Sequence, residues 1–104
     1  MDISLLEQYF KAGAIEKGSE MAEELFKVIG EEMDYLMSFP RRFAASIRGD
    51  LERRQVMLYH LCRITRQHAP ELFEKYRLYW NMLFPGEPFN ETMLFDLDDD
   101  EWEY

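Results

Sequence analysis

With 104 residues, the chain has the size of a single domain. Apolar residues make up 47% and charged residues 32%, a composition typical of a folded globular protein rather than a disordered one. The net charge of −9 argues against binding of the whole chain to nucleic acid or to an anionic membrane. The single cysteine, Cys62, excludes an intrachain disulfide and a zinc site built on several thiolates.

The sequence also bears on location. No apolar stretch approaches the ~20 residues that a membrane-spanning helix requires. The first residues lack the basic region of a signal peptide, and Glu7 and Gln8 interrupt their apolar positions. A lone cysteine fits a reducing compartment. We therefore expect a cytoplasmic protein that does not span a membrane.

Apolar residues in the first forty positions recur at helical spacing, and no segment shows the alternation of a strand. Ser4 and Glu7 form a capping-box pattern, which predicts the start of a first helix. Gly13 and Gly18 weaken the next stretch, so this helix is expected to end near Lys11 or to bend there. Ser19 precedes several glutamates and is the expected N-cap of a second helix, which Pro40 ends. The apolar face of this second helix comprises Ala22, Leu25, Phe26, Ile29, Met33, Leu36 and Met37.

Two interpretations fit the middle of the chain. In the first, a short helix begins at Pro40, Gly49 ends it, and Asp50 caps a new helix that runs to Gln67. The inward side chains of the short helix would be Phe43, Ala44 and Ile47. In the second, one long helix runs from Pro40 to Gln67 and tolerates Gly49. Both make this segment the central helix, because it is apolar on a wide arc formed by Val56, Met57, Leu58, Leu61, Cys62, Ile64 and Thr65.

The last predicted helix begins at Pro70 and ends before Pro85. We therefore predict an all-α fold, a compact bundle of four or five helices over residues 1–84 with an acidic C-terminal extension over residues 85–104. The expected core residues are Leu25, Phe26, Ile29, Leu58, Leu61, Leu72, Tyr76 and Trp80.

Charge is distributed unevenly along the chain. Residues 1–40 hold three basic and nine acidic residues, residues 41–77 nine basic and four acidic, and residues 78–104 eight acidic and none basic. The central cations are mostly arginines, which suit bidentate pairing with carboxylate or phosphate. They include Arg41, Arg42, Arg48, Arg53, Arg54, Arg63 and Arg66.

Three interpretations of these arginines remain open. They pair with acids of neighbouring helices, or they bind the acidic extension of the same or a second copy, or they contact nucleic acid. The flanking acidic segments disfavour nucleic acid, since they would repel a duplex. Arginines exposed on one face without acidic partners would favour nucleic acid, whereas arginines paired with Glu or Asp would favour an ordinary surface.

The extension interleaves acids with large apolar residues, as in segments that dock into a partner protein. Acids steer the encounter and apolar side chains supply the buried anchors. The predicted partner-binding residues are Met93, Leu94, Phe95, Leu97, Asp98, Asp99, Asp100 and Trp102. In the alternative interpretation, Phe89, Leu94, Leu97 and Trp102 lie back over the helices and complete the core.

Catalytic signals are absent from the sequence. His60 and Cys62 are two residues apart, so on a helix they point about 200° apart and cannot act as a local pair. The chain contains no phosphate-binding loop and no nucleophile elbow. We therefore expect no catalytic residue, metal or cofactor.

These observations predict a small acidic, non-enzymatic binding protein that acts through contacts with another protein. Such a protein would be an inhibitor, an adaptor or a regulatory accessory subunit, with a basic nucleic-acid-handling protein as one kind of target. The alternative is a nucleic-acid-associated accessory subunit that uses the central arginines. The self-complementary charges also allow a homodimer.

Overall fold

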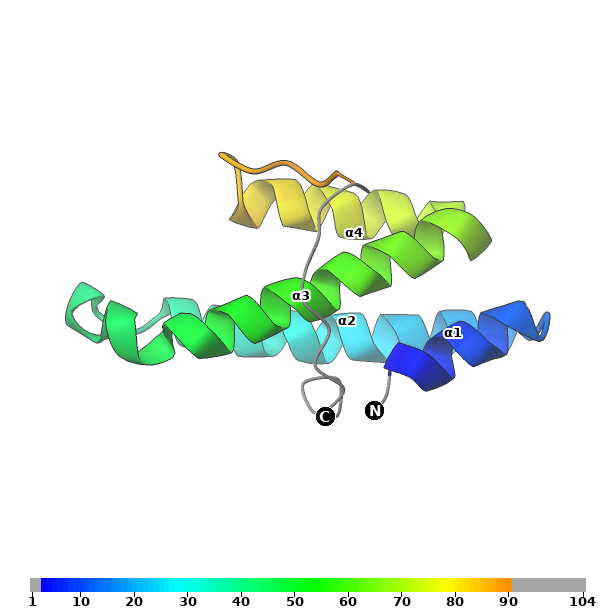
Figure 1. Cartoon of the computed structure of the whole chain (residues 1–104), viewed down its shortest axis with the longest axis horizontal. Helices are drawn as coiled ribbons and strands as arrows, with labels where there is room; N and C mark the ends of the chain where they lie inside the picture. Colours follow the sequence, from blue (N-terminus) through cyan, green and yellow to red (C-terminus); the bar gives the residue numbers. More distant parts are fainter. Residues whose placement is uncertain (1–2, 91–104) are drawn as a thin grey trace.

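The computed structural model describes residues 3–90, which form an all-α bundle as predicted (Figure 1). Its elements are α1 (Ile3–Lys11), α2 (Ile15–Met37), the short 3-10 helix η1 (Arg41–Phe43), α3 (Ala44–His68) and α4 (Pro70–Leu83). No strand occurs among these described residues. The connections are short, and the molecule is elongated, with extents of 46, 27 and 24 Å.

Helix α3 is the central element of the bundle. It contacts α4 on one side and α2 and α1 on the other, so three helices surround it (Figure 1). The wide apolar arc of this segment is the reason, since burying it requires neighbours on more than one face. The prediction of a central helix is therefore confirmed.

The core draws side chains from all four helices. Six of the eight predicted core residues are at most 1% exposed, namely Leu25, Ile29, Leu58, Leu61, Tyr76 and Trp80. Phe26 and Leu72 are only partly buried and pack against the margin of the core, so the prediction that they are core residues is wrong. The Phe26 ring lies 4.4 Å from the Tyr76 ring, between centroids, at the edge of the α2–α4 contact.

Both serine caps predicted near the N-terminus are wrong. Helix α1 begins at Ile3, so Ser4 lies inside its first turn. Helix α2 begins at Ile15, four residues before Ser19. Gly18 therefore lies inside α2, where its buried backbone packs on Phe10 of α1. This contact between α1 and α2 supplies a tertiary reason for the earlier start.

The long-helix interpretation of the middle segment is correct about Gly49, although the helix begins at Ala44 rather than at Pro40. Helix α3 continues through Gly49, which costs about 1 kcal/mol relative to alanine but avoids nucleating another helix. Asp50 is not an N-cap and instead pairs with Arg53 and Arg54. Pro40 precedes a 3-10 turn rather than a separate α-helix.

The prediction that Phe43, Ala44 and Ile47 face the core is wrong. Phe43 and Ala44 are exposed and Ile47 is only half-buried. Figure 1 shows the reason, because this end of α3 extends beyond both α1 and α4 and has only the end of α2 beside it.

The glycines of the long helices give a first prediction. Gly49→Ala should raise the free energy of unfolding by about 0.5–1 kcal/mol, because a Cβ there meets open space in a helix interior. Gly18→Ala should lower it, because the new Cβ would lie 3.0 Å from the Phe10 ring. Urea unfolding of both variants checks these opposite signs, and equal shifts would contradict the packing of α1 on α2.

Leu61 tests the placement of α3. Because Leu61 is fully buried, Leu61→Ala should lower the free energy of unfolding by about 2–5 kcal/mol. Leu78 is 58% exposed on α4, so Leu78→Ala is the matched control and should change it by less than about 1 kcal/mol. Thermal or urea unfolding measures both, and an unchanged midpoint for Leu61→Ala would contradict the fold.

Candidate interaction surfaces

The predicted partner-binding residues all follow Asn90. Met93, Leu94, Phe95, Leu97, Asp98, Asp99, Asp100 and Trp102 lie outside the described residues. Their roles therefore stay a prediction. What the structure shows is the point on the bundle from which this segment starts.

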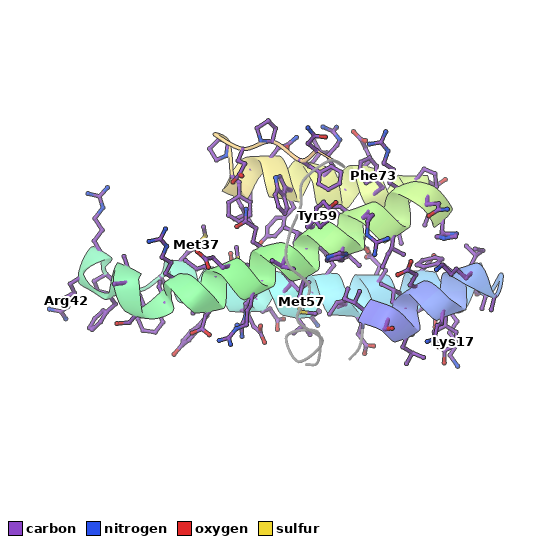
Figure 2. The ribbon with its side chains drawn as sticks, viewed as in Figure 1. Lys17, Met37, Arg42, Met57, Tyr59 and Phe73 are labelled. Carbon is purple, nitrogen blue, oxygen red and sulfur yellow. The ribbon has the colours of Figure 1, made fainter. Side chains whose placement is uncertain are left out.

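The chain between α4 and Asn90 folds back along α4. The Phe89 ring lies 5.8 Å from Tyr59, 5.6 Å from Phe73 and 5.9 Å from Trp80, between centroids. Figure 2 shows Tyr59 and Phe73 where α3 and α4 face each other. The Phe89 backbone N–H donates to Asn81 Oδ1 at 3.1 Å. Residues 91–104 therefore begin at an anchored position on the bundle surface.

The central arginines are largely paired with carboxylates of the same chain. Arg54 Nε donates to Glu32 Oε2 of α2 at 2.7 Å, and its guanidinium also lies 3.6 Å from Asp50. Arg53 bonds the same Asp50, and Arg48 lies 3.4 Å from Glu52. Arg66 lies over the Phe73 ring, 5.6 Å from its centroid. This pattern matches the ordinary-surface interpretation of the basic segment.

Arg63 joins α3 to α1. Its guanidinium lies 3.4 Å from Glu7 Oε2, and its Nε donates to His60 Nδ1 at 3.1 Å. Partial burial would raise the pKa of Glu7, but hydrogen bonds and charges from Arg63 and Lys11 outweigh burial and lower it. Desolvation, followed by the Arg63 charge, lowers the pKa of His60 to about 4. His60 is therefore a neutral hydrogen-bond acceptor near pH 7.

Two arginines differ from the rest. Neither Arg41 nor Arg42 forms an ion pair within residues 3–90, and both are exposed. The Arg42 guanidinium lies over the Phe43 ring, 4.9 Å from its centroid. Both lie in η1, which joins α2 to α3, and Figure 2 shows Arg42 at this end of the molecule.

Exposed aromatic rings gather beside these two cations. Tyr35 contacts Phe39 edge-on with ring centroids 5.1 Å apart, and Phe39 contacts Phe43 in the same way at 6.1 Å. Tyr35 is 66% exposed and Phe43 39%. We call this surface the hairpin end and define it by Tyr35, Met37, Phe39, Arg41, Arg42 and Phe43. Sequence reasoning missed it, although the aromatic spacing of four residues on each side of Phe39 was a usable signal.

The outer face of α2 carries an acidic depression. It is lined by Glu16, Ser19, Glu20, Glu23, Glu24, Phe26, Lys27 and Lys75. Tyr76 donates its hydroxyl to Glu23 Oε1 at 2.7 Å, and Lys75 Nζ lies 2.8 Å from the other oxygen. The Lys75 hydrogen bond is the main cause of the lowered pKa of Glu23. Glu23 thus holds α4 against α2.

The described residues offer few groups for metal or nucleophilic chemistry. Among them, no three His, Cys, Asp or Glu side chains gather as a metal site. Cys62 is buried in the core, and desolvation raises the pKa of its thiol to about 12. No helix in residues 3–90 combines the length and apolar character needed to cross a membrane.

Comparison of the chain with protein-family models, characterised proteins and solved structures finds no match.

The buried histidine gives a prediction about pH. The pKa of His60 is lowered from 6.5 to about 4 in the fold, so the unfolded chain binds the His60 proton more tightly than the folded chain does. The free energy of unfolding is therefore unaffected by His60 at pH values above 6.5 and decreases as the pH falls from 6.5 towards 4. Acidification from pH 7 to about 4.5 should cost about 2 kcal/mol through this residue. His60→Asn keeps an acceptor near the Nδ1 position but does not titrate. Urea unfolding across this range should therefore show a shallower pH dependence for the variant, and identical slopes would contradict the assignment.

Proposed function

We propose that the chain is a small non-enzymatic binding protein that acts through protein–protein contacts made by residues 91–104. The observation that supports the proposal is the unequal distribution of net charge between residues 3–90 and residues 91–104. Residues 3–90 hold 12 basic and 13 acidic residues, whereas residues 91–104 hold seven acidic residues and none basic. Nearly all the net charge therefore belongs to the last 14 residues.

Ion pairs within the bundle support this division of roles. Arg54 with Glu32, Arg63 with Glu7 and Lys75 with Glu23 link different helices. Carboxylates used in this way are occupied in holding the bundle together. The acids of the C-terminal segment are the concentrated charge that can steer a partner.

The apolar residues of the segment suit binding rather than solubility alone. Leu94, Phe95, Leu97 and Trp102 stand among the acids, and a solubilising tail needs none of them. Large aromatic and aliphatic side chains are the usual anchors of a protein interface. The complementary partner is a protein with a basic surface that contains an apolar groove. An inhibitor, adaptor or regulatory subunit of a basic nucleic-acid-handling protein has this chemistry.

The alternative is a nucleic-acid accessory subunit. Arg41 and Arg42 favour it, because exposed cations beside aromatic rings are typical of surfaces that bind single strands. The pairing of Arg48, Arg53, Arg54 and Arg63 with carboxylates weakens it. If it holds, single-stranded DNA should bind with an affinity that falls steeply with salt and depends on Arg41 and Arg42.

Affinity capture tests the proposed function. A variant with Leu94, Phe95, Leu97 and Trp102 changed to Ser keeps every acid of the segment but removes its anchors. One anchor contributes about 2 kcal/mol or more to binding. The amount of partner captured by this variant should therefore be lower than that captured by the full chain by a factor of about ten or more. Quantitative mass spectrometry of proteins captured from the organism's own cells measures the ratio.

The matched control removes exposed apolar side chains from the bundle instead. Leu78→Ser with Met82→Ser changes two residues of α4 that are 58% and 66% exposed. This control should capture partners as the full chain does. Equal capture by the segment variant, or no protein specifically retained by the full chain, would count against the proposal. A variant that lost its cooperative thermal unfolding would show that the segment completes the core, which also overturns it.

A further inference from the structure

We propose that the hairpin end is a docking surface for the acidic C-terminal segment of the same chain, and that residues 98–104 are the part that binds there. The inference uses the segment to which the proposed function assigns partner binding. It adds an intramolecular site for that segment and requires no external partner.

The hairpin end exposes several large apolar side chains around a half-buried Phe39. Tyr35 and Met37 are 66% and 48% exposed, and Phe43 is 39% exposed. The rings of Tyr35, Phe39 and Phe43 form a continuous edge-to-face row that ends under the Arg42 guanidinium. A row of rings closed by a cation can receive an aromatic side chain flanked by carboxylates.

Charge complementarity identifies the occupant as acidic. Arg41 and Arg42 form no ion pair within residues 3–90, while Arg48, Arg53, Arg54 and Arg63 of the same basic segment do. Residues 98–104 read Asp-Asp-Asp-Glu-Trp-Glu-Tyr and supply five carboxylates around two aromatic rings. Arginine forks bind carboxylates in bidentate fashion, so two such forks match this composition.

The segment is long enough to reach the hairpin end. It starts beside Phe89, whose ring lies 5.8 Å from that of Tyr59 on α3. Tyr59 and Phe43 are separated by about 25 Å along the helix axis, at ~1.5 Å per residue. Eight extended residues cover ~27 Å. Starting from residue 91, this path brings residue 98 to the hairpin end, so residues 98–104 are within reach of it.

A tethered segment has the advantage over other acidic occupants. A short flexible connection holds its end at a local concentration on the order of millimolar. A second copy of the chain would have to reach that concentration to compete.

Paramagnetic broadening on the full chain tests the proposal. A spin label on Ser46→Cys lies in the first turns of α3, next to the hairpin end. Cys62 is fully buried and does not compete for the label. In the proposed state, amide signals of residues 98–104 and the Trp102 indole signal lose most of their intensity when the label is oxidised, and regain it when the label is reduced.

Charge reversal at the hairpin end supplies the specific comparison. Arg41→Glu with Arg42→Glu should restore the intensities of residues 98–104. Lys11→Glu with Lys17→Glu makes the same change in net charge at the end of α1 and the start of α2, and should leave the broadening in place. Figure 2 shows Lys17 at the end of the molecule opposite Arg42. Salt near 1 M, where the Debye length is ~3 Å, should also weaken it.

The outcomes that overturn the proposal are distinct from those that bear on partner capture. Absence of broadening in the labelled chain overturns it, as does broadening that persists after reversal of Arg41 and Arg42. Broadening seen when an isotope-labelled chain without a spin label is mixed with a spin-labelled unenriched chain assigns the contact to a second copy and overturns the intramolecular site. Any of these results leaves the capture experiment, and the proposed function, to stand or fall separately.

Discussion

The burial of α3 on nearly all sides is the constraint on which the rest of the structure depends. From Met57 to Cys62 every consecutive side chain is buried, and Ile64 and Thr65 continue the stretch. A helix buried around its circumference needs neighbours on several faces, which α4, α2 and α1 provide. The buried Thr65 of this stretch is satisfied within the helix, since its hydroxyl donates to the Leu61 carbonyl at 2.7 Å.

This central burial is confined to the C-terminal half of α3, and the contrast with its first half produces the hairpin end. The first turns of α3 and the last turn of α2 extend beyond α1 and α4 (Figure 1). Aromatic residues there have no helix layer to enter, so they stack on one another and on Arg42. The most exposed aromatic surface of the bundle thus follows from a mismatch in helix length.

Charge is distributed differently in the bundle and in residues 91–104. Within the bundle, cations and carboxylates from different helices meet, as in the Arg63 link from His60 of α3 to Glu7 of α1. The described part is close to neutral, with 12 basic and 13 acidic residues, and each partly exposed pair contributes at most about 1 kcal/mol to the packing of its helices. The net charge is left to residues 91–104, which begin at a fixed point because Phe89 is held among Tyr59, Phe73 and Trp80. Concentrated charge on an anchored segment is the physical basis of the proposed binding role.

The sequence by itself determined the helical class, the central position of α3 and most of the core, because apolar spacing sums many side chains into one strong signal. It also located the ends of α1 and α4, where Gly13 and Pro85 act directly on the backbone. Tertiary structure alone decided the start of α2 and the passage of α3 through Gly49. An N-cap stabilises a helix by about 1 kcal/mol, and a glycine in a helix interior destabilises it by a similar amount. Effects of this size did not decide these two boundaries, where Gly18 packs on Phe10 and α3 continues as one long helix. Tertiary structure also decided which arginines find carboxylates and which rings stay exposed, because partners such as Arg54 and Glu32 are distant in sequence and meet only when α3 packs on α2.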